Sequence, residues 1–183
     1  MTDIKFVRAE TCSPGHAAGA ASAPGRTDLR WDIIELLFFA YRDFVGDADE
    51  VLEAFGFGRA HHRVMHFVHR YPGLTVADLL EVLRITKQSL GRVLKQLLDE
   101  EYIVQRAGHL DRRQRLLFAT AKGEALVGKL ASLQTDRITR AFGGFDETEQ
   151  GAVARFLRAM IDRDDPDKVL AQLLDDNVTT TKD

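Results

Sequence analysis

The sequence predicts a mainly α-helical fold with one small β-hairpin. Along most of residues 29–162, apolar side chains recur every three or four positions, which is the spacing of helices buried on one side. Two short stretches, 102–107 and 114–120, are typical of strands, and the segment between them contains a glycine and two arginines, as a polar turn would. The hydrophobic share of 45% is ordinary for a globular protein, so 183 residues are enough for one core.

The N-terminal part divides into an extension and a strongly apolar helical region. Residues 1–28 are small, polar and proline-containing, and we expect a flexible extension there. This extension holds Cys12, the only cysteine, so one chain cannot form an internal disulfide or a multi-cysteine metal site. Residues 29–45 are apolar on nearly all sides, and a short acidic helix closed by glycines is expected over 46–58. Because so apolar a helix needs burial on more than one side, we assign 29–57 to N-terminal dimerisation helices.

The middle of the chain contains three short helices with start or stop signals. The first is expected over 59–71 and is stopped by a Pro-Gly pair. Thr75 caps the second, and Asp78 completes an approximate capping box three residues later. After a two-residue turn, Thr86 caps the third helix, which is expected over 87–101 and has a leucine-rich apolar face.

Longer helices are expected after the second strand. Thr120 caps a helix over about 121–142, which a Gly-Gly pair ends. Asp146 caps a further helix, and a short amphipathic segment and a polar tail follow. We assign residues 121–175 to C-terminal dimerisation helices and residues 176–183 to the tail.

Two short helices joined by a tight turn, followed by a hairpin with a basic tip, form a winged helix-turn-helix, which we assign to residues 58–120. Such a domain places one helix in a groove of double-stranded DNA and the basic loop in the next. The net charge of −3 at first argues against contact with DNA. However, residues 84–115 contain eight Lys and Arg against four acids, a local charge of +4 that leaves −7 for the remainder. Because salt screens charges beyond about 8–10 Å, the local charge decides.

The polar face of the helix over 87–101 offers groups that hydrogen bond to bases and phosphates. The candidate DNA-binding residues of this recognition helix are Thr86, Lys87, Gln88, Ser89, Gly91, Arg92 and Lys95. Glutamine pairs with adenine, and Lys or Arg pairs with guanine or holds a phosphate. A glycine in mid-helix costs about 1 kcal/mol relative to alanine, so Gly91 indicates either close approach of DNA or a clash avoided inside the protein.

The expected wing carries a second group of candidate DNA-binding residues. Arg112, Arg113 and Arg115 lie at or near its tip, and arginine is favoured in narrow, negatively charged minor grooves. Asp111 would repel phosphate, so we expect it to stabilise the wing by pairing with a neighbouring arginine. The alternative is that Asp111 is an ordinary turn residue.

Two segments match a known pattern of motifs. One is PGLTVADLLEVLRITKQSLGRVLKQLLDEEYIVQR, with its two helices and turn, and the other is DRRQRLLFATAKGEAL, in which Asp-Arg-Arg precedes a strand, Thr120 and Gly123. In both, the chain resembles the MarR family of transcriptional regulators, over about residues 29–162. The chain departs from the family pattern at Gly108 and His109, where the family wing often has an acidic residue and a proline.

The first residues lack the apolar region of a secretory signal, so we expect a cytoplasmic protein. We expect a repressor, and the sequence leaves an activator as the open alternative. The resemblance implies a homodimer that is formed by the first and last helices and acts on palindromic operators. The residues agree, because the same helices are too apolar to face solvent. The apolar residues concerned are Ile33, Ile34, Leu37, Phe38, Leu126, Leu130, Leu133, Phe156, Met160 and Ile161. Two-fold symmetry then places two recognition helices on successive major grooves, about 34–36 Å apart.

The resemblance also implies a small effector, often an aromatic acid, in a pocket between the dimerising and DNA-binding parts. The candidate pocket residues are Phe38, Tyr41, Phe44, His62, Met65 and His66, and core packing is the alternative explanation for this cluster. His62, His66 and His69 share one helical face, at a spacing that suits a metal ion or haem in a sensor of the same fold. Ordinary hydrogen bonding is the alternative for these histidines, and the sequence predicts no metal site and no cofactor.

Other function classes have less support in the sequence. A winged helix used only for protein contact needs neither a basic tip nor a polar recognition face. There is no glycine-rich phosphate loop, no Gly-x-Ser-x-Gly motif and no nucleophilic cysteine in an expected helix or strand, so no enzyme is predicted. No apolar run approaches the roughly 18 residues that span a bilayer, so no membrane partner is expected. The predicted partners are double-stranded DNA, a second copy of the chain and a small aromatic or hydrophobic effector.

Overall fold

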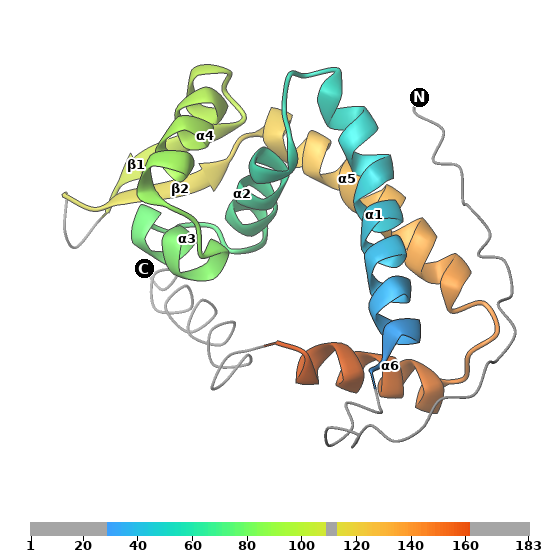
Figure 1. Ribbon diagram of the computed structural model, residues 1–183. Helices are drawn as coiled ribbons and strands as arrows, with labels where there is room; N and C mark the ends of the chain where they lie inside the picture. The colour runs from blue at the N-terminus through green and yellow to red at the C-terminus, as the bar shows by residue number, and fades with distance from the viewer. Residues whose placement is uncertain (1–28, 109–112, 162–183) are drawn as a thin grey trace, which may run out of the picture.

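The computed structural model of the chain describes residues 29–108 and 113–161. The expected N-terminal extension, the tip of the expected wing and the C-terminal segment with its polar tail lie outside these ranges. Within them, the elements in chain order are α1 (Trp31–Glu53), α2 (Arg59–Arg70), α3 (Val76–Leu83), α4 (Lys87–Asp99), β1 (Ile103–Ala107), β2 (Arg115–Ala119), α5 (Ala121–Ala141) and α6 (Glu147–Ala159). This is the mainly α-helical fold with one hairpin that the sequence predicts (Figure 1).

Most helices begin where the sequence predicts, because their first turns are capped by local hydrogen bonds. The Thr75 hydroxyl oxygen accepts from the backbone N–H of Asp78 (3.2 Å), and the Asp78 carboxylate accepts from the backbone N–H of Thr75 (2.7 Å). Thr86 caps α4, Thr120 caps α5 and Asp146 caps α6 in the same manner. These caps involve only residues three apart in the chain, which is why the sequence alone predicts them.

Helix α1 is longer than predicted. The sequence predicts a break near Gly46 and a separate acidic helix over 46–58, but α1 continues to Glu53. A glycine inside a helix costs only about 1 kcal/mol, and the continued helix places Ala48 and Leu52 fully inside the core. The expectation of two helices is therefore wrong, because burial outweighs the weak break.

One hydrophobic core joins the winged helix-turn-helix to the long helices. Its buried residues come from α1 to α5 and from both strands. Leu126 and Leu130 of α5 belong to this core, with 5% and 0% of their surface exposed. The expectation that these two residues face a second chain is therefore wrong. Helical periodicity showed that this side of α5 is apolar, but it does not show what covers it.

The two strands form an antiparallel hairpin that is tied to the helix-turn-helix. In the register of the pair, Gln105 lies opposite Leu117. The chain just before α3 forms a bridge to the outer edge of β2: the Gly73 N–H donates to the Leu117 carbonyl (2.8 Å), and the Leu117 N–H donates to the Leu74 carbonyl (2.9 Å). The hairpin is thereby fixed relative to the start of α3.

The elements are arranged in two parts (Figure 1). Helices α2, α3 and α4 and the hairpin gather at one end, and α1 and α5 lie side by side and lead to α6 at the other. No residue of α6 is buried. Large apolar side chains exposed at this second end are Leu29, Trp31, Ile34, Leu36, Phe38, Phe39, Phe145, Phe156, Leu157, Met160 and Ile161. The residues that the structure describes therefore leave the first half of α1 and most of α6 uncovered.

Candidate nucleic-acid interface

Helix α4 buries its apolar side and exposes its polar side. Leu90, Val93, Leu94 and Leu97 are buried in the core. The exposed residues include all seven that the sequence predicts as DNA-binding: Thr86, Lys87, Gln88, Ser89, Gly91, Arg92 and Lys95. Contacts with α2 and β1 hold the buried side of α4, so its polar side is free to approach another molecule.

Hydrogen bonds organise the first turn of α4. The Thr86 hydroxyl oxygen accepts from the backbone N–H of Ser89 (3.2 Å), and the same hydroxyl donates to Ser89 Oγ (2.9 Å). Thr86 therefore serves as the helix cap, and its donor is used within the protein. Lys87 and Gln88, in the same turn, are the longer side chains and are better suited to reach a base edge.

Two cations lie on the exposed side of α4 beyond its first turn. Lys95 Nζ forms an ion pair with Asp99, one helical turn later. Both side chains of this pair are largely exposed, so the pair contributes little and a phosphate can replace Asp99 at small cost. Arg92 is exposed on the preceding turn. Both residues are thus available to hold a DNA backbone.

Gly91 is surrounded by open space. A Cβ built on Gly91 meets no atom within 4 Å in the part of the chain that the structure describes. A side chain at position 91 would therefore not clash with the described residues. The alternative that Gly91 avoids such a clash is wrong for these residues. Close approach of DNA to Gly91, which costs the helix about 1 kcal/mol relative to alanine, stays a prediction.

Two arginines outside the predicted set shape the turn between α3 and α4. Arg84 ends α3 in the left-handed conformation, with φ of 49°, which is uncommon for residues other than glycine. Arg63 of α2 donates to the backbone carbonyl of Leu83 (3.0 Å) and so satisfies one of the last carbonyls of α3. No sequence signal marks Arg63 for this role, because its partner lies 20 residues away.

The hairpin adds cations next to the helix-turn-helix. Arg115 begins β2, Arg113 precedes it, and both are exposed. Arg106 of β1 lies over the Phe118 ring, with its guanidinium carbon 4.8 Å from the ring centroid. It is a further cation of the hairpin that the predicted set omits. Arg112 and Asp111 lie outside the described residues, so the DNA contact of the first and the stabilising role of the second stay predictions.

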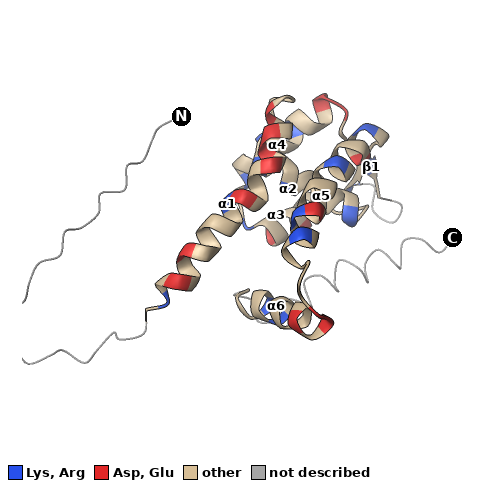
Figure 2. Cartoon of the chain, turned by 90° about the vertical axis from the view of Figure 1, so that its right-hand side faces the viewer, with Lys and Arg blue, Asp and Glu red and all other residues tan. Residues whose placement is uncertain are grey.

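Charge is distributed unevenly between the two parts of the chain. Helix α1 carries seven Asp and Glu and a single Arg. Figure 2 shows acidic residues along α1 and basic residues around β1. An acidic body with a basic end turns its basic end toward a polyanion.

Comparison with known proteins agrees with this geometry. A model of the MarR family matches residues 55–114. The HTH-type transcriptional regulator PetP of Rhodobacter capsulatus is 43% identical over 129 residues, which cover 70% of this chain and 78% of PetP. The chain belongs to the MarR family. It is a winged helix-turn-helix transcriptional regulator, as the resemblance in its sequence implies.

Solved structures of MarR-family proteins share the fold at low sequence identity. A MarR-family regulator from Silicibacter pomeroyi is 18% identical and superimposes with a TM-score of 0.62, covering 73% of this chain and 92% of that one. The MepR protein of S. aureus is 20% identical and has a TM-score of 0.57, covering 68% of this chain and 91% of that one. The MepR structure is a complex with DNA.

In this MarR-family chain, α5 begins against the end of the recognition helix α4. The Thr120 hydroxyl donates to the backbone carbonyl of Glu101 (2.7 Å). A Cβ on Gly123 would lie 2.1 Å from the Tyr102 carbonyl oxygen, so only glycine fits at that position. The glycine of the wing motif therefore has a physical reason: it allows the first turn of α5 to contact the backbone that enters β1.

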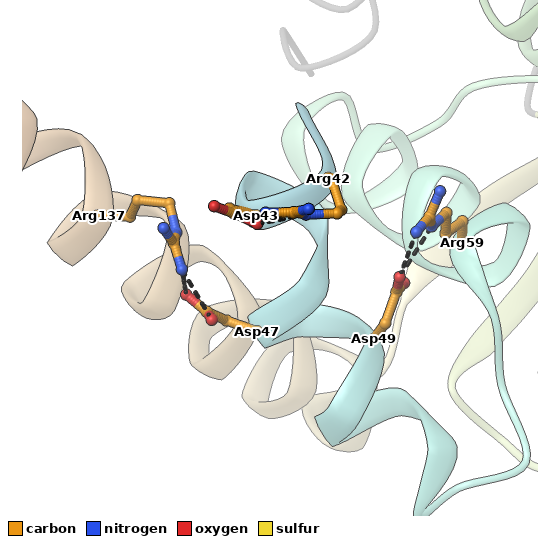
Figure 3. Close-up of polar contacts among 6 residues, drawn as sticks. All are labelled: Arg42, Asp43, Asp47, Asp49, Arg59 and Arg137. Carbon is orange, nitrogen blue, oxygen red and sulfur yellow. Dashed lines mark hydrogen bonds and ion pairs between the residues drawn. The ribbon is translucent and has the colours of Figure 1, made fainter. Parts of the chain in front are cut away.

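Two ion pairs join α1 to its neighbouring helices α2 and α5 (Figure 3). The Arg137 guanidinium of α5 donates to both carboxylate oxygens of Asp47, at 2.9–3.1 Å. Arg59 of α2 pairs with Asp49 at 2.8 Å. Because Asp47 and Asp49 are two residues apart on one helix, α1 links the position of α2 to that of α5.

The candidate pocket residues do not share one environment. Met65 is only 1% exposed and lies in the core, so core packing is the correct explanation for this residue. Phe38 and Tyr41 are 70% and 56% exposed in the single chain. The remaining three, at positions 44, 62 and 66, are half-buried. Their role in a pocket stays a prediction.

The half-buried histidines of α2 favour the neutral form. Burial lowers the pKa of His62, and the neighbouring His66 lowers it further. Burial likewise lowers the pKa of His66, followed by the charge of Arg70. In the two described ranges, no three His, Cys, Asp or Glu side chains are grouped as a metal site would require. The helices within those ranges also include none with the length and apolarity to cross a bilayer.

Proposed function

We propose that this MarR-family regulator works as a homodimer that binds a palindromic operator in double-stranded DNA and represses transcription there. The exposed polar side of α4, next to a cationic hairpin, is the observation that carries this proposal. In each protomer, α4 lies in a major groove with Lys87 and Gln88 at the base edges. Arg113 and Arg115 follow the hairpin into the adjacent minor groove. Such binding requires access to the chromosome, in agreement with the expected location in the cytoplasm.

A second copy of the chain accounts for the apolar end of the molecule. Phe38 is 70% exposed and Phe156 is 46% exposed, and monomeric proteins rarely leave apolar patches of this kind open. An isolated helix of 13 residues such as α6 is marginal in water unless another surface covers it. Two-fold symmetry through these helices turns both copies of α4 toward one side of the duplex, about 34–36 Å apart, so the operator is an inverted repeat.

DNA binding is tested by selecting genomic fragments that the full chain retains, and by measuring their affinity from fluorescence anisotropy at several salt concentrations. The double change Arg113→Ala and Arg115→Ala should weaken binding to all sequences and reduce the salt slope by about 1–2. Lys129→Ala, which removes an exposed cation of α5, is the matched control. The proposal fails if no fragment binds at low salt, and the role of the hairpin fails if the double variant keeps the original salt slope.

We also propose that a small aromatic or hydrophobic effector binds between α1 and α2 and lowers the affinity for the operator. These helices carry half-buried rings, Phe44 on α1 and His62 and His66 on α2, and the Arg59–Asp49 ion pair joins the same two helices. An effector acts only if it binds the DNA-free form more tightly than the bound form. A thermal-shift screen of aromatic acids should therefore yield compounds that both stabilise the protein and release the operator. Stabilising compounds that leave operator affinity unchanged would contradict this mechanism.

A further inference from the structure

Both ring nitrogens of His61 take part in hydrogen bonds, one that caps α2 and one that reaches α4. The backbone N–H of Gly58 donates to Nδ1 (3.1 Å), and Nε2 lies 2.9 Å from the side-chain oxygen of Gln96. Because Nδ1 is an acceptor, Nε2 carries the proton and donates to Gln96. The ring therefore connects the first turn of α2 to α4, between residues 35 positions apart in the chain.

The hydrogen bonds continue from Gln96 to the end of α4. The Gln96 side-chain nitrogen donates to a carboxylate oxygen of Glu100 (2.9 Å). The backbone carbonyl of Glu100 in turn accepts from Lys122 Nζ of α5 (2.9 Å). Successive hydrogen bonds thus join Gly58, His61, Gln96 and Glu100, and such a network supports a single arrangement of these groups. This series of bonds, the His61–Gln96 link, runs from the loop after α1 to the start of α5.

The His61 ring is also held by aromatic packing. It stacks on Phe57, with 4.9 Å between the ring centroids and 15° between the planes. Phe57 meets the ring of Tyr102 edge-on at 5.0 Å, and both of these residues are buried. The imidazole is thus confined on one side by the core, while its edge points its nitrogens at two specific partners.

We propose that His61 is a positioning residue for operator recognition. Through Gln96, it fixes the orientation of α4 relative to α2 and to the start of α5. That orientation decides whether side chains such as Gln88 and Arg92 meet base edges or only phosphates. The inference rests on the proposed function, because it concerns how well α4 reads a sequence.

Two substitutions separate the hydrogen bonds of His61 from its packing. His61→Phe keeps a ring against Phe57 and removes both hydrogen bonds, whereas His61→Gln keeps one acceptor and one donor on a side chain of similar reach. We expect His61→Phe to raise the Kd for a selected operator about tenfold and the Kd for random-sequence DNA less than about twofold. His61→Gln should restore operator affinity to within about threefold. His69→Phe, on the same helix, is the control.

A third variant tests the other end of the link. Gln96→Leu leaves the His61 ring in place and should match His61→Phe, and the double variant should lose no more than either single change. If the wild-type chain binds a selected operator and His61→Phe binds it equally well, the positioning role is wrong while the proposed function stands. An equal loss for operator and random DNA, or additive losses in the double variant, also rejects the role. Thermal unfolding of each variant shows whether it is folded, and Gln96→Leu decides the question if His61→Phe is not.

Discussion

The winged helix-turn-helix and the apolar end formed by the first half of α1 and by α6 differ in how far the chain covers its own surface. In the winged part, Leu79, Leu90 and Leu97 are completely buried. At the apolar end, Phe38 and Phe156 are 70% and 46% exposed, and no residue of α6 is buried. The described residues therefore cover one region themselves, and in the proposed dimer a second chain covers the other. The winged part packs within one chain, but under the proposed function its placement on an operator depends on association of two chains.

The largest effect is expected from a charge on the apolar side of α6. Phe156→Asp should prevent association, and because the dimer binds two half-sites at once, operator affinity should fall by about 10²-fold or more. The winged part should stay folded, so the far-UV circular dichroism of the whole chain should keep most of its helical signal. Sedimentation and anisotropy measure the two effects. Ala154→Asp adds the same charge on another side of the same helix and is the control. If Phe156→Asp sediments and binds DNA like the wild type, α6 does not form the interface.

A substitution inside the complete region should destabilise the chain in a different way. Gly123→Ala places a Cβ 2.1 Å from the Tyr102 carbonyl oxygen, and we expect a loss of about 1–3 kcal/mol in the free energy of unfolding. Gly128→Ala is a matched control on the same helix, because a Cβ there meets no described atom within 4 Å. It should be neutral or stabilise by up to about 1 kcal/mol. Urea unfolding compares the two, and equal effects of both changes would show that the α4–α5 junction is not tight.

Gly91→Ala should separate folding from function within the winged part. The new Cβ meets nothing in the described chain, so unfolding should become harder by about 1 kcal/mol. Operator affinity should fall at the same time, about fivefold or more, because the methyl group occupies the space of an approaching DNA backbone. Urea unfolding and anisotropy on one preparation measure both. A variant that is more stable and binds equally well would leave the glycine without a role in DNA contact.

The two regions also differ in what the sequence can predict. The caps at Thr75, Thr86 and Thr120 are confirmed because each depends on residues three positions away. The polar side of α4 follows from helical spacing alone. In contrast, the continuation of α1 past Gly46 depends on burial against distant helices, and periodicity cannot tell that Leu126 faces the chain's own core.

Contacts within the candidate site are harder to predict from the sequence, because they too depend on residues that are distant along the chain. The sequence identifies Lys95 as a cation on α4, but the structure pairs it with Asp99. It places His61 only on the helix expected over 59–71, whereas the structure joins this residue to Gln96, 35 positions away. Residue type and spacing indicate which groups are available. Which partner each group takes depends on packing between elements that the sequence does not place relative to one another.

The smallest effect is expected from pH, and it concerns two histidines on helix α2 of the winged part. Burial lowers the folded-state pKa of His62 and His66 below the ordinary value of 6.5. As the pH falls through 6.5, the unfolded chain takes up protons at these positions and the folded chain does not. Folding is therefore most favourable above about pH 6.5 and weakens on acidification, until the pH reaches the lowered pKa values and the loss levels off.

Urea unfolding at pH 7.5 and at pH 5.5 measures this difference. The double change His62→Gln and His66→Gln removes both titrating rings, so its stability should change less between the two pH values than that of the wild type. His69→Gln is the control, because it lies on the same helix. Equal pH dependence in the wild type and in the double variant would show that these two rings do not cause the acid sensitivity.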